Sequence, residues 1–309
     1  MNLRWLPRFS SLPVFPRTLR DILVIGASGL LGQHLMREAT ARGDRPVGTY
    51  AGNPVEGLLP LDLSDLEGIG PRIVETRPSI VALAGAMTNV DGCESAPDLA
   101  ARINALAPGR VAEACRTVGA RLVHFSTDYV FDGRTGPSDE EGTPNPISVY
   151  GRSKLDGERL VLAALPSALV IRSCANFGWN RLRSKENNVT MIVNRLRRKE
   201  PVSLFADQWV SPSYVPHVAR VAFDLLDRGA SGVFHVATRG CYTRLEVGAA
   251  VADVFGLPRE LLRPTAMAQA KLVAPRPARS CLASKRLERF PDIPVPTFRA
   301  ALEDMRRSE

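Results

Sequence analysis

The fold of this chain is decided by the stretch Asp21-Ile22-Leu23-Val24-Ile25-Gly26-Ala27-Ser28-Gly29-Leu30-Leu31-Gly32. Its first five residues form a short apolar run that ends at glycine, as is typical of a buried strand. The residues after it follow a helical pattern that stops at Gly43, a residue suited to the C-terminal end of a helix. Gly26, Gly29 and Gly32 therefore join a strand to a helix. Their missing side chains permit a tight turn, close packing of the helix, and close approach of a pyrophosphate to backbone N–H groups.

Short apolar strands and helical segments alternate along the first half of the chain. After the opening strand, further strands are predicted at residues 46–50, 58–61, 80–83, 121–126 and 168–172. One intervening helix is expected to begin with an N-cap at Ser64 and to run to about Thr76. This alternation predicts an α/β fold, a Rossmann-type doubly wound parallel sheet. Functional sites in such sheets lie at the carboxyl ends of the strands, here at Gly26, Ala84-Gly85-Ala86, Ser126-Thr127 and Ser173.

The character of the chain changes after about residue 174. Residues 174–188 are polar and contain glycine, which favours a loop over a substrate, and residues 263–277 are also loop-rich. Further helices are predicted at 189–199, 214–228, 243–255 and near the C-terminus, and further strands at 202–205 and 233–236. We therefore predict an NAD(P)-binding Rossmann domain over 21–173 and a smaller, mainly substrate-binding lobe over 174–309. Segments near 213–237 are expected to return to the first domain.

Residues 1–20 contain four arginines and three prolines and no acidic residue. The prolines interrupt any continuous apolar core, which argues against a secretory signal. A targeting peptide stays open, but we expect a disordered N-terminal extension or a misassigned start.

The composition is that of a globular protein, since 45% of the 309 residues are hydrophobic and 23% are charged. A formal net charge of +8 favours an anionic partner. The basic residues are not interleaved with aromatic ones, which disfavours nucleic acid, whereas a nucleotide or diphosphate substrate suits the charge equally well. The longest apolar stretch, residues 160–171, is short for a membrane span and contains Pro166. We therefore expect no nucleic-acid partner and no membrane segment.

The five cysteines are odd in number, widely scattered and without metal-ligand spacing. We therefore expect free thiols in a reducing cytosol, a cytoplasmic location and no metal site. The cysteines are Cys93, Cys115, Cys174, Cys241 and Cys281. The four histidines have no ligand spacing either, and His124, within an apolar strand pattern, is expected to be a hydrogen-bonded structural residue.

Two further strings carry the chemistry: Ser126-Thr127-Asp128-Tyr129-Val130-Phe131-Asp132-Gly133 and Tyr150-Gly151-Arg152-Ser153-Lys154. The first follows an apolar strand and the second opens a helix, on which residues four apart share one face. The Lys154 ammonium should therefore lower the pKa of the Tyr150 phenol and make it an acid usable near neutral pH. A hydroxyl at Thr127 could hold a carbonyl oxygen at the same place. These three groups meet the needs of reversible hydride transfer to a ketone, and the glycine turn disfavours the alternative of an exposed helix pair.

The end of the second strand bears on the choice of dinucleotide. It reads Thr49-Tyr50-Ala51-Gly52-Asn53 and lacks the acid that usually binds an adenosine ribose. NADP(H) is therefore allowed, but no arginine is placed to demand it, so NAD(H) stays open. Asp62, just after the third strand, could accept a hydrogen bond from the adenine amino group, or could act as an ordinary cap before Ser64.

The spacing Gly-x-x-Gly-x-x-Gly together with Tyr-x-x-x-Lys resembles the extended short-chain dehydrogenase/reductase superfamily. Within it, residues 125–133 and 150–158 resemble the dTDP-4-dehydrorhamnose reductases. Supporting matches are Thr88-Asn89-Val90-Asp91, Asn104, Asp207-Gln208 with Pro212, and Arg276-Pro277 with Ser280 and Leu282. The resemblance runs from about Asp21 to the C-terminus.

This resemblance implies that NADPH or NADH reduces the 4-keto group of a nucleotide-linked 6-deoxyhexose, a dTDP-sugar being favoured, in deoxysugar or polysaccharide biosynthesis. Tyr150 would donate the proton, Thr127 would orient the carbonyl oxygen, and Lys154 would bind the nicotinamide ribose. Asn104 would support a proton relay to Lys154. The implied cofactor contacts are Gly26, Ser28, Gly29, Leu30, Leu31, Gly32, Asp62, Leu63, Ala84, Gly85, Ala86, Thr88, Tyr150 and Lys154. The implied substrate contacts are Thr88, Val90, Asp128, Tyr129, Asn188 and Trp209, and a homodimer is left open.

One residue separates reduction from dehydration within the superfamily. Related nucleotide-sugar dehydratases carry a glutamate after the Thr-Asp pair, because elimination of water needs a second acid/base pair, whereas this chain has Tyr129. Met87 departs from the aromatic residue or histidine usual in the reductases. Trp209, Trp179 and the basic run from Arg181 could shape a different substrate pocket, or Trp179 could be a core anchor.

A family from another functional class is also similar. The regulatory beta subunit of methionine adenosyltransferase shares a Gly-Leu-Leu-Gly opening and both chemical strings. On that interpretation the chain binds a dinucleotide and a partner enzyme, and catalysis is vestigial. Asp207-Gln208, which the reductases share, favours the enzyme.

Overall fold

Seven parallel strands form the central sheet of the chain, in the order β3-β2-β1-β4-β5-β6-β9. The computed structural model describes residues 19–183 and 185–309. The strands are β1 (Asp21–Ile25), β2 (Arg45–Tyr50), β3 (Leu59–Pro60), β4 (Ile80–Leu83), β5 (Arg121–Thr127), β6 (Leu169–Ser173) and β9 (Gly232–His235). The predicted doubly wound parallel sheet is confirmed.

Both faces of this sheet are covered by helices, which is why its strands read as continuous apolar runs. Alternate residues of β1 enter different cores. Ile22 and Val24 pack with α1 (Leu30–Ala41) and α8 (Val215–Asp227), whereas Leu23 and Ile25 pack with the opposite helical layer. That layer contains α2 (Leu66–Thr76), α5 (Ala107–Val118) and α6 (Val149–Ala164). Between β4 and α5 lie α3 (Val90–Ser95), α4 (Pro97–Ala101) and a π-helix at Arg102–Leu106.

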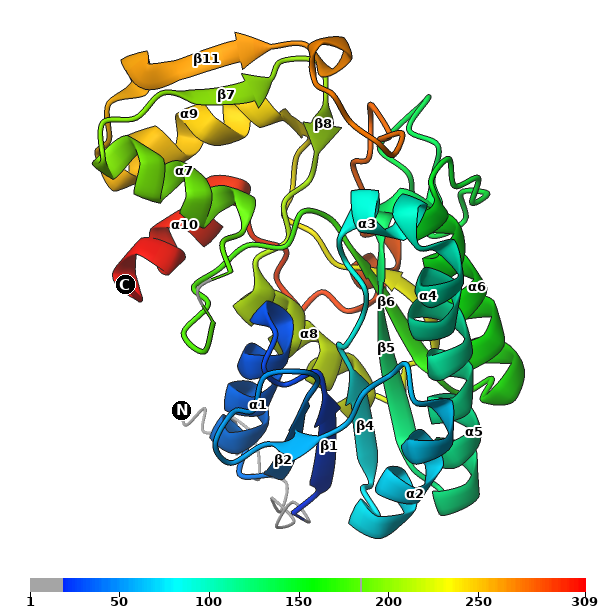
Figure 1. Cartoon of the computed structure of the whole chain (residues 1–309). Coiled ribbons are helices and arrows are strands. Elements are labelled where there is room, and N and C mark those ends of the chain that lie inside the picture. The colour runs from blue at the N-terminus through cyan, green and yellow to red at the C-terminus, as the bar shows by residue number, and fades with distance from the viewer. Residues whose placement is uncertain (1–18, 184) are drawn as a thin grey trace, which may run out of the picture.

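A smaller lobe lies over the carboxyl edge of the sheet (Figure 1). It contains α7 (Asn188–Arg197), α9 (Arg244–Phe255) and α10 (Phe298–Arg307), packed around a third apolar core. Two short strand pairs complete it: β7 (Val202–Phe205) runs parallel to β11 (Leu262–Thr265), and β8 (Trp209–Val210) runs antiparallel to β10 (Tyr242–Thr243). The chain leaves this lobe after β8, adds α8 and β9 to the sheet, and then returns.

Two local predictions need correction. The N-cap of α2 is Asp65 rather than Ser64, because the Asp65 carboxylate accepts a hydrogen bond from the Gly68 N–H. The loop-rich stretch 263–277 overlaps strand β11, which forms because β7, distant in sequence, pairs with it. For residues 1–18 the prediction of a disordered N-terminal extension lies outside the residues that the structure describes. Arg20, the last residue of the predicted extension, forms ion pairs with Asp44 and Asp227.

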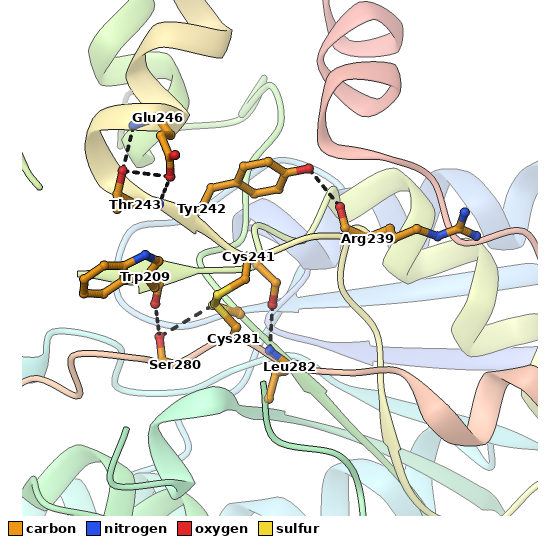
Figure 2. The surroundings of a disulfide bond; sticks show 11 residues. Trp209, Arg239, Cys241, Tyr242, Thr243, Glu246, Ser280, Cys281 and Leu282 are labelled. Carbon is orange, nitrogen blue, oxygen red and sulfur yellow. Dashed lines mark hydrogen bonds between the residues drawn. A yellow bond between two sulfur atoms is a disulfide. The ribbon is translucent and has the colours of Figure 1, made fainter. Parts of the chain in front are cut away.

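The expectation of five free thiols is wrong, because Cys241 and Cys281 form a disulfide (Figure 2). Cys241 directly precedes β10, which pairs with β8, while the Ser280 N–H donates to the Trp209 carbonyl on β8. The two cysteines are 40 residues apart in sequence, but β8 brings their segments together, with Cα atoms 5.6 Å apart. Cys93, Cys115 and Cys174 are free and buried.

His124 is fully buried in β5, as the apolar pattern suggested. Neither of its ring nitrogens has a hydrogen-bond partner within the described part of the chain, so the expectation of a hydrogen-bonded histidine is wrong. Burial, followed by the nearby Lys154 charge, holds the pKa of His124 well below its usual range. The ring is therefore neutral at physiological pH.

In the part of the chain that the structure describes, no helix combines the length and the apolar character that crossing a membrane requires.

Candidate active site

A cleft of about 830 Å³ opens at the carboxyl edge of the sheet, between the sheet and the smaller lobe. Several strand ends reach it, among them Gly26 after β1, Ala84 after β4, Thr127 at the end of β5 and Ser173 at the end of β6. Because parallel strands end at one edge, segments that are distant in sequence meet there. The volume is within the range of small-molecule and cofactor sites.

The glycine turn shapes one end of the cleft. Gly26 has a φ of +84°, and a Cβ there would lie 2.6 Å from the Gly85 nitrogen. A Cβ on Gly32 would lie 2.1 Å from the Gly26 carbonyl oxygen, so neither position accepts a side chain. Gly29 is the N-cap of α1, where no side chain caps the helix and no acidic residue occupies the first turn. The exposed N–H groups and the helix dipole therefore fit an anionic group such as a pyrophosphate.

Tyr150 and Lys154 lie on the first turns of α6 and both line the cleft. The helix begins there because the Ser148 side chain accepts a hydrogen bond from the Gly151 N–H at 3.1 Å. The Lys154 side chain is only 2% exposed, and its Nζ donates to the Phe125 carbonyl at 2.7 Å. Burial lowers the pKa of Lys154 to about 8, against the opposing effect of the Glu158 carboxylate.

The acidity of Tyr150 differs from the expectation. Burial raises the pKa of the Tyr150 phenol above its usual value, and the nearby Asp128 and Tyr129 raise it further, whereas a hydrogen bond with Thr127 lowers it. The expected lowering by Lys154 is not found, because the ammonium is directed to the Phe125 carbonyl. The phenol is therefore protonated at neutral pH and is suited to donate a proton.

Polar groups at the end of β5 surround this phenol. The Thr127 hydroxyl donates to the Asp128 carboxylate at 2.9 Å and accepts from the Tyr129 N–H at 3.2 Å. Burial raises the pKa of Asp128, against hydrogen bonds from Ser280, Cys174 and Thr127. The Tyr129 and Tyr150 rings meet edge to face, with centroids 5.7 Å apart. Hydroxyl and carboxyl groups thus converge on one wall of the cleft.

Asn104 lies behind this wall and not in the cleft. Its side chain is fully buried on the π-helix and exchanges two hydrogen bonds with the Met87 backbone, at 2.9 and 3.0 Å. Its Nδ2 also donates to the Ser153 hydroxyl at 3.1 Å. These contacts join the loop after β4 to α6, next to Lys154.

The other predicted cofactor contacts all line the cleft. They are Gly26, Ser28, Gly29, Leu30, Leu31, Gly32, Asp62, Leu63, Ala84, Gly85, Ala86 and Thr88. Asp62 also accepts a hydrogen bond from the Ser64 N–H at 2.8 Å, so one carboxylate oxygen has the local capping role that its position allowed.

Of the predicted substrate contacts, all but Trp209 line the cleft. Those in the cleft are Thr88, Val90, Asp128, Tyr129 and Asn188. Trp209 does not line it, and its ring instead carries the Arg279 guanidinium at 4.3 Å. Trp179 is a core anchor, since it packs edge to face on Phe255 and its Nε1 donates to the Met305 carbonyl at 2.8 Å.

The comparisons with known proteins agree with this geometry. Residues 20–308 match the family model described as the RmlD substrate binding domain. The chain belongs to this family. The predicted resemblance is confirmed by its relatives in the RmlD family.

A probable low-salt glycan biosynthesis reductase of Haloferax volcanii is 37% identical, over 86% of this chain and 90% of that protein. A dTDP-4-dehydrorhamnose reductase of Mycobacterium tuberculosis is 34% identical, over 91% and 90% respectively. Methionine adenosyltransferase 2 subunit beta of Rattus norvegicus is 33% identical, over 79% and 75%. The crystal structure of dTDP-4-dehydrorhamnose reductase from Bacillus anthracis in complex with NADP superposes with a TM-score of 0.86 at 27% identity, covering 94% of this chain and 100% of that one.

In this RmlD family member the smaller lobe supplies the opposite wall of the cleft, mostly from the segment 174–188 that was expected to lie over the substrate. Its polar residues are Asn176, Asn180, Arg183, Lys185, Glu186, Asn187 and Arg244. The Arg244 Nε donates to the Gln208 side-chain oxygen at 3.1 Å, while its Nη1 is buried without a hydrogen-bond partner among the described residues. The residue that the sequence analysis missed is Arg244, which has no motif of its own and lies 36 residues beyond Gln208, the nearest motif residue that it contacts.

Proposed function

We propose that the chain is an NAD(P)H-dependent reductase acting on the 4-keto group of a nucleotide-linked 6-deoxyhexose, in deoxysugar or polysaccharide biosynthesis. The observation that carries the proposal is that Thr127, Tyr150 and Lys154 line the same cleft as the glycine turn. Two relatives named as reductases, one of them of dTDP-4-dehydrorhamnose, support this substrate class and favour a dTDP-sugar.

The chain's own groups fit the dinucleotide along the sheet edge. The N–H groups at the start of α1 would hold the pyrophosphate, Asp62 would accept from the adenine amino group, and Lys154 would bind the nicotinamide ribose. The NADP bound in the Bacillus anthracis relative supports this assignment. When bound, the reduced nicotinamide supplies the hydride.

The proton comes from the protein. As hydride reaches the 4-keto carbon, negative charge develops on the carbonyl oxygen, which Thr127 would orient toward Tyr150. Tyr150 would then donate its phenolic proton to that oxygen and leave a phenolate, while Lys154 would hold the nicotinamide ribose beside it. Asn104 would serve the relay to Lys154 by holding Ser153 and the Met87 backbone in place.

Simple reduction is favoured over dehydration by the residue that follows Asp128. Elimination of water needs a second acid/base pair. Burial raises the pKa of Tyr129 to about 12, so its phenol is protonated at neutral pH and cannot serve as the base. Asp128, Tyr129, Thr88, Val90 and Asn188 would instead contact the sugar nucleotide, and the unpartnered donor of Arg244 would bind an oxygen of it.

The direct test is turnover. Purified protein is incubated with dTDP-4-keto-6-deoxyhexose and either NADPH or NADH, and the loss of nicotinamide absorbance is followed. We expect oxidation of the dinucleotide that depends on both the protein and the keto sugar. Absence of turnover across a panel of keto-sugar nucleotides, despite dinucleotide binding, would contradict the enzyme.

That negative outcome would favour the second candidate, a non-catalytic dinucleotide-binding regulatory subunit. The observation behind it is the 33% identity to methionine adenosyltransferase 2 subunit beta. Co-purification with a methionine adenosyltransferase would support it.

The proposal assigns the dinucleotide to residues 21–173 together with α8 and β9, and the sugar mainly to the rest of the chain. It includes a cytoplasmic location and a homodimer. Leu106 on the π-helix and Leu160 on α6 are 48% and 39% exposed. They are the apolar side chains proposed to pack between the two copies. Sedimentation of the purified protein tests the dimer.

A further inference from the structure

The segment that follows β6 is fastened to the first turns of α1. The Gln33 side chain donates to the Asn180 side-chain oxygen at 2.9 Å and accepts from the Arg181 N–H at 2.9 Å. The neighbouring His34 ring lies 3.2 Å from the Trp179 carbonyl. Figure 1 shows this segment, in green between β6 and α7, descending toward α1. A piece of the smaller lobe is thereby held beside the glycine turn.

This attachment carries Arg183 to the end of β2. The Arg183 N–H donates to the Asn180 side-chain oxygen at 3.0 Å, which fixes the backbone. The Arg183 guanidinium contacts the loop after β2, where its Nη2 donates to the Asn53 carbonyl at 2.8 Å. Arg183 lines the cleft, as does Ala51 at the end of β2. The arginine is 130 residues from the loop that it contacts.

The charge around Arg183 is not neutralised locally. Within the ranges that the structure describes, no carboxylate forms an ion pair with it, unlike Arg20 or Arg42 near the other end of α1. The stretch from Thr49 to Asn53 contains no acid. A guanidinium has five N–H donors, and the Asn53 carbonyl engages one nitrogen, so the group retains the capacity to bind phosphate oxygens.

The end of the second strand is where dinucleotide folds distinguish their ligands. An acid there hydrogen-bonds the ribose 2′-hydroxyl of NAD, whereas a nearby arginine accommodates the 2′-phosphate of NADP. We propose that Arg183 is the 2′-phosphate anchor of this chain and makes the cleft prefer NADPH to NADH. The inference rests on the proposed function only in requiring that the cleft binds a dinucleotide. The end of β2 carries no arginine, and the segment before α7 supplies one.

Binding measurements test this without turnover. The dissociation constants of NADPH, NADH, 2′,5′-ADP and 5′-AMP are measured by calorimetric titration of the full chain. Wild type should bind NADPH and 2′,5′-ADP more tightly than their counterparts without the 2′-phosphate. Arg183→Ala should raise the dissociation constants of the two 2′-phosphorylated ligands about tenfold and change those of NADH and 5′-AMP less than twofold. Arg183→Lys, which keeps the charge but not the planar fork, should fall between.

Arg181→Ala is the matched control. Arg181 lies in the same segment and is exposed, but its guanidinium donates to the Ser308 carbonyl, and it does not line the cleft. This variant should keep the wild-type ratio of NADPH to NADH affinity. Thermal unfolding of each variant checks that the fold is retained.

The outcomes separate the inference from the proposed function. If Arg183→Ala weakened the binding of NADPH and of NADH equally, the arginine would only connect the lobe to Asn53, and the inference would be overturned. Unchanged binding of both, or wild-type preference for NADH, would overturn it as well. Wild-type protein that binds no dinucleotide would overturn the proposed function itself, together with this inference.

Discussion

The two walls of the cleft differ in how the chain encodes them. On the sheet side, Gly26, Gly29 and Gly32 lie within seven residues, and Tyr150 and Lys154 are one helical turn apart. On the lobe side, Arg244 is oriented by Gln208 across 36 residues, and Arg183 reaches Asn53 across 130. Short motifs placed at one edge by the parallel sheet therefore build the first wall, whereas long-range side-chain contacts build the second.

This difference has a functional meaning. The groups proposed for the chemistry lie on a helix and a strand whose backbone is fixed by hydrogen bonding within a buried sheet. Of the groups proposed for selectivity, Arg244 opens α9 three residues after Cys241 of the disulfide, whereas Arg183 lies on the segment between β6 and α7. Substitutions on the sheet side should change the rate of the reaction, and those on the lobe side should change which ligand is bound and how tightly.

The largest expected effect belongs to the sheet side. Tyr150→Phe removes the proton donor, so turnover should fall about 10²- to 10⁴-fold, as is usual for loss of general acid catalysis. The dissociation constant of NADPH should change less than about twofold, because the ring and its packing remain. Steady-state kinetics and calorimetric titration measure the two quantities.

Tyr129→Phe is the matched control, since its ring packs edge to face on Tyr150 but is not proposed to donate the proton. If turnover were retained in Tyr150→Phe and lost in Tyr129→Phe, Tyr129 would be the proton donor. The Tyr150–Lys154 motif on α6 would then not carry the chemistry.

The second effect tests the stability of the lobe. Replacing Cys241 and Cys281 together by serine removes a crosslink that closes a 40-residue separation, which should lower the free energy of unfolding by about 2–4 kcal/mol. Chemical denaturation measures it. Addition of a reductant should destabilise the wild type to the same extent and leave the double variant unchanged. Equal stability of wild type and variant in the absence of reductant would contradict a stabilising role for the disulfide.

The third effect concerns recognition by the lobe. Arg244→Ala removes a buried guanidinium donor from the cleft and should raise the KM for the sugar nucleotide about tenfold, with little change in NADPH binding. The control is Arg279→Ala, which removes an arginine of the same lobe that stacks on Trp209 outside the cleft lining. If both variants raised KM equally, Trp209 and its surroundings would belong to the substrate site after all.

The smallest effect is a pH dependence on the sheet side. The pKa of Lys154 is lowered from 10.5 to about 8 by burial, so the ammonium is lost as the pH rises through 8, and turnover should be halved near that pH. Stability should respond in the opposite direction. Between about pH 8 and 10.5 the unfolded chain binds more protons at this lysine than the folded chain, so the Lys154 contribution to the unfolding free energy rises with pH.

Lys154→Met should remove that rise in stability, which comparison of denaturation curves with wild type would reveal. A turnover profile that is flat to pH 9 in the wild type would contradict the requirement for the ammonium.

Much of the fold and of the sheet wall could be predicted, because strand and helix periods and the glycine turn are local properties. The strand ends of a parallel sheet then assemble Thr127, Tyr150 and the turn at one edge. The direction of the Lys154 ammonium could not be predicted from its spacing to Tyr150, since the Phe125 carbonyl that it contacts belongs to another element. The same holds for the π-helix that directs Asn104 to Met87 and Ser153.

By itself, the sequence determined the doubly wound sheet, the glycine turn and the group of hydroxyl, phenol and ammonium, because strand and helix periods are local and the strands of a parallel sheet end at one edge. Only the tertiary structure decided the disulfide, the raised pKa of Tyr150, the displacement of Trp209 from the cleft, and the arrival of Arg244 and Arg183. These depend on burial and on contacts between segments that β8 and α1 bring together. Such contacts have no period or spacing along the chain, so they arise only when the lobe packs over the sheet.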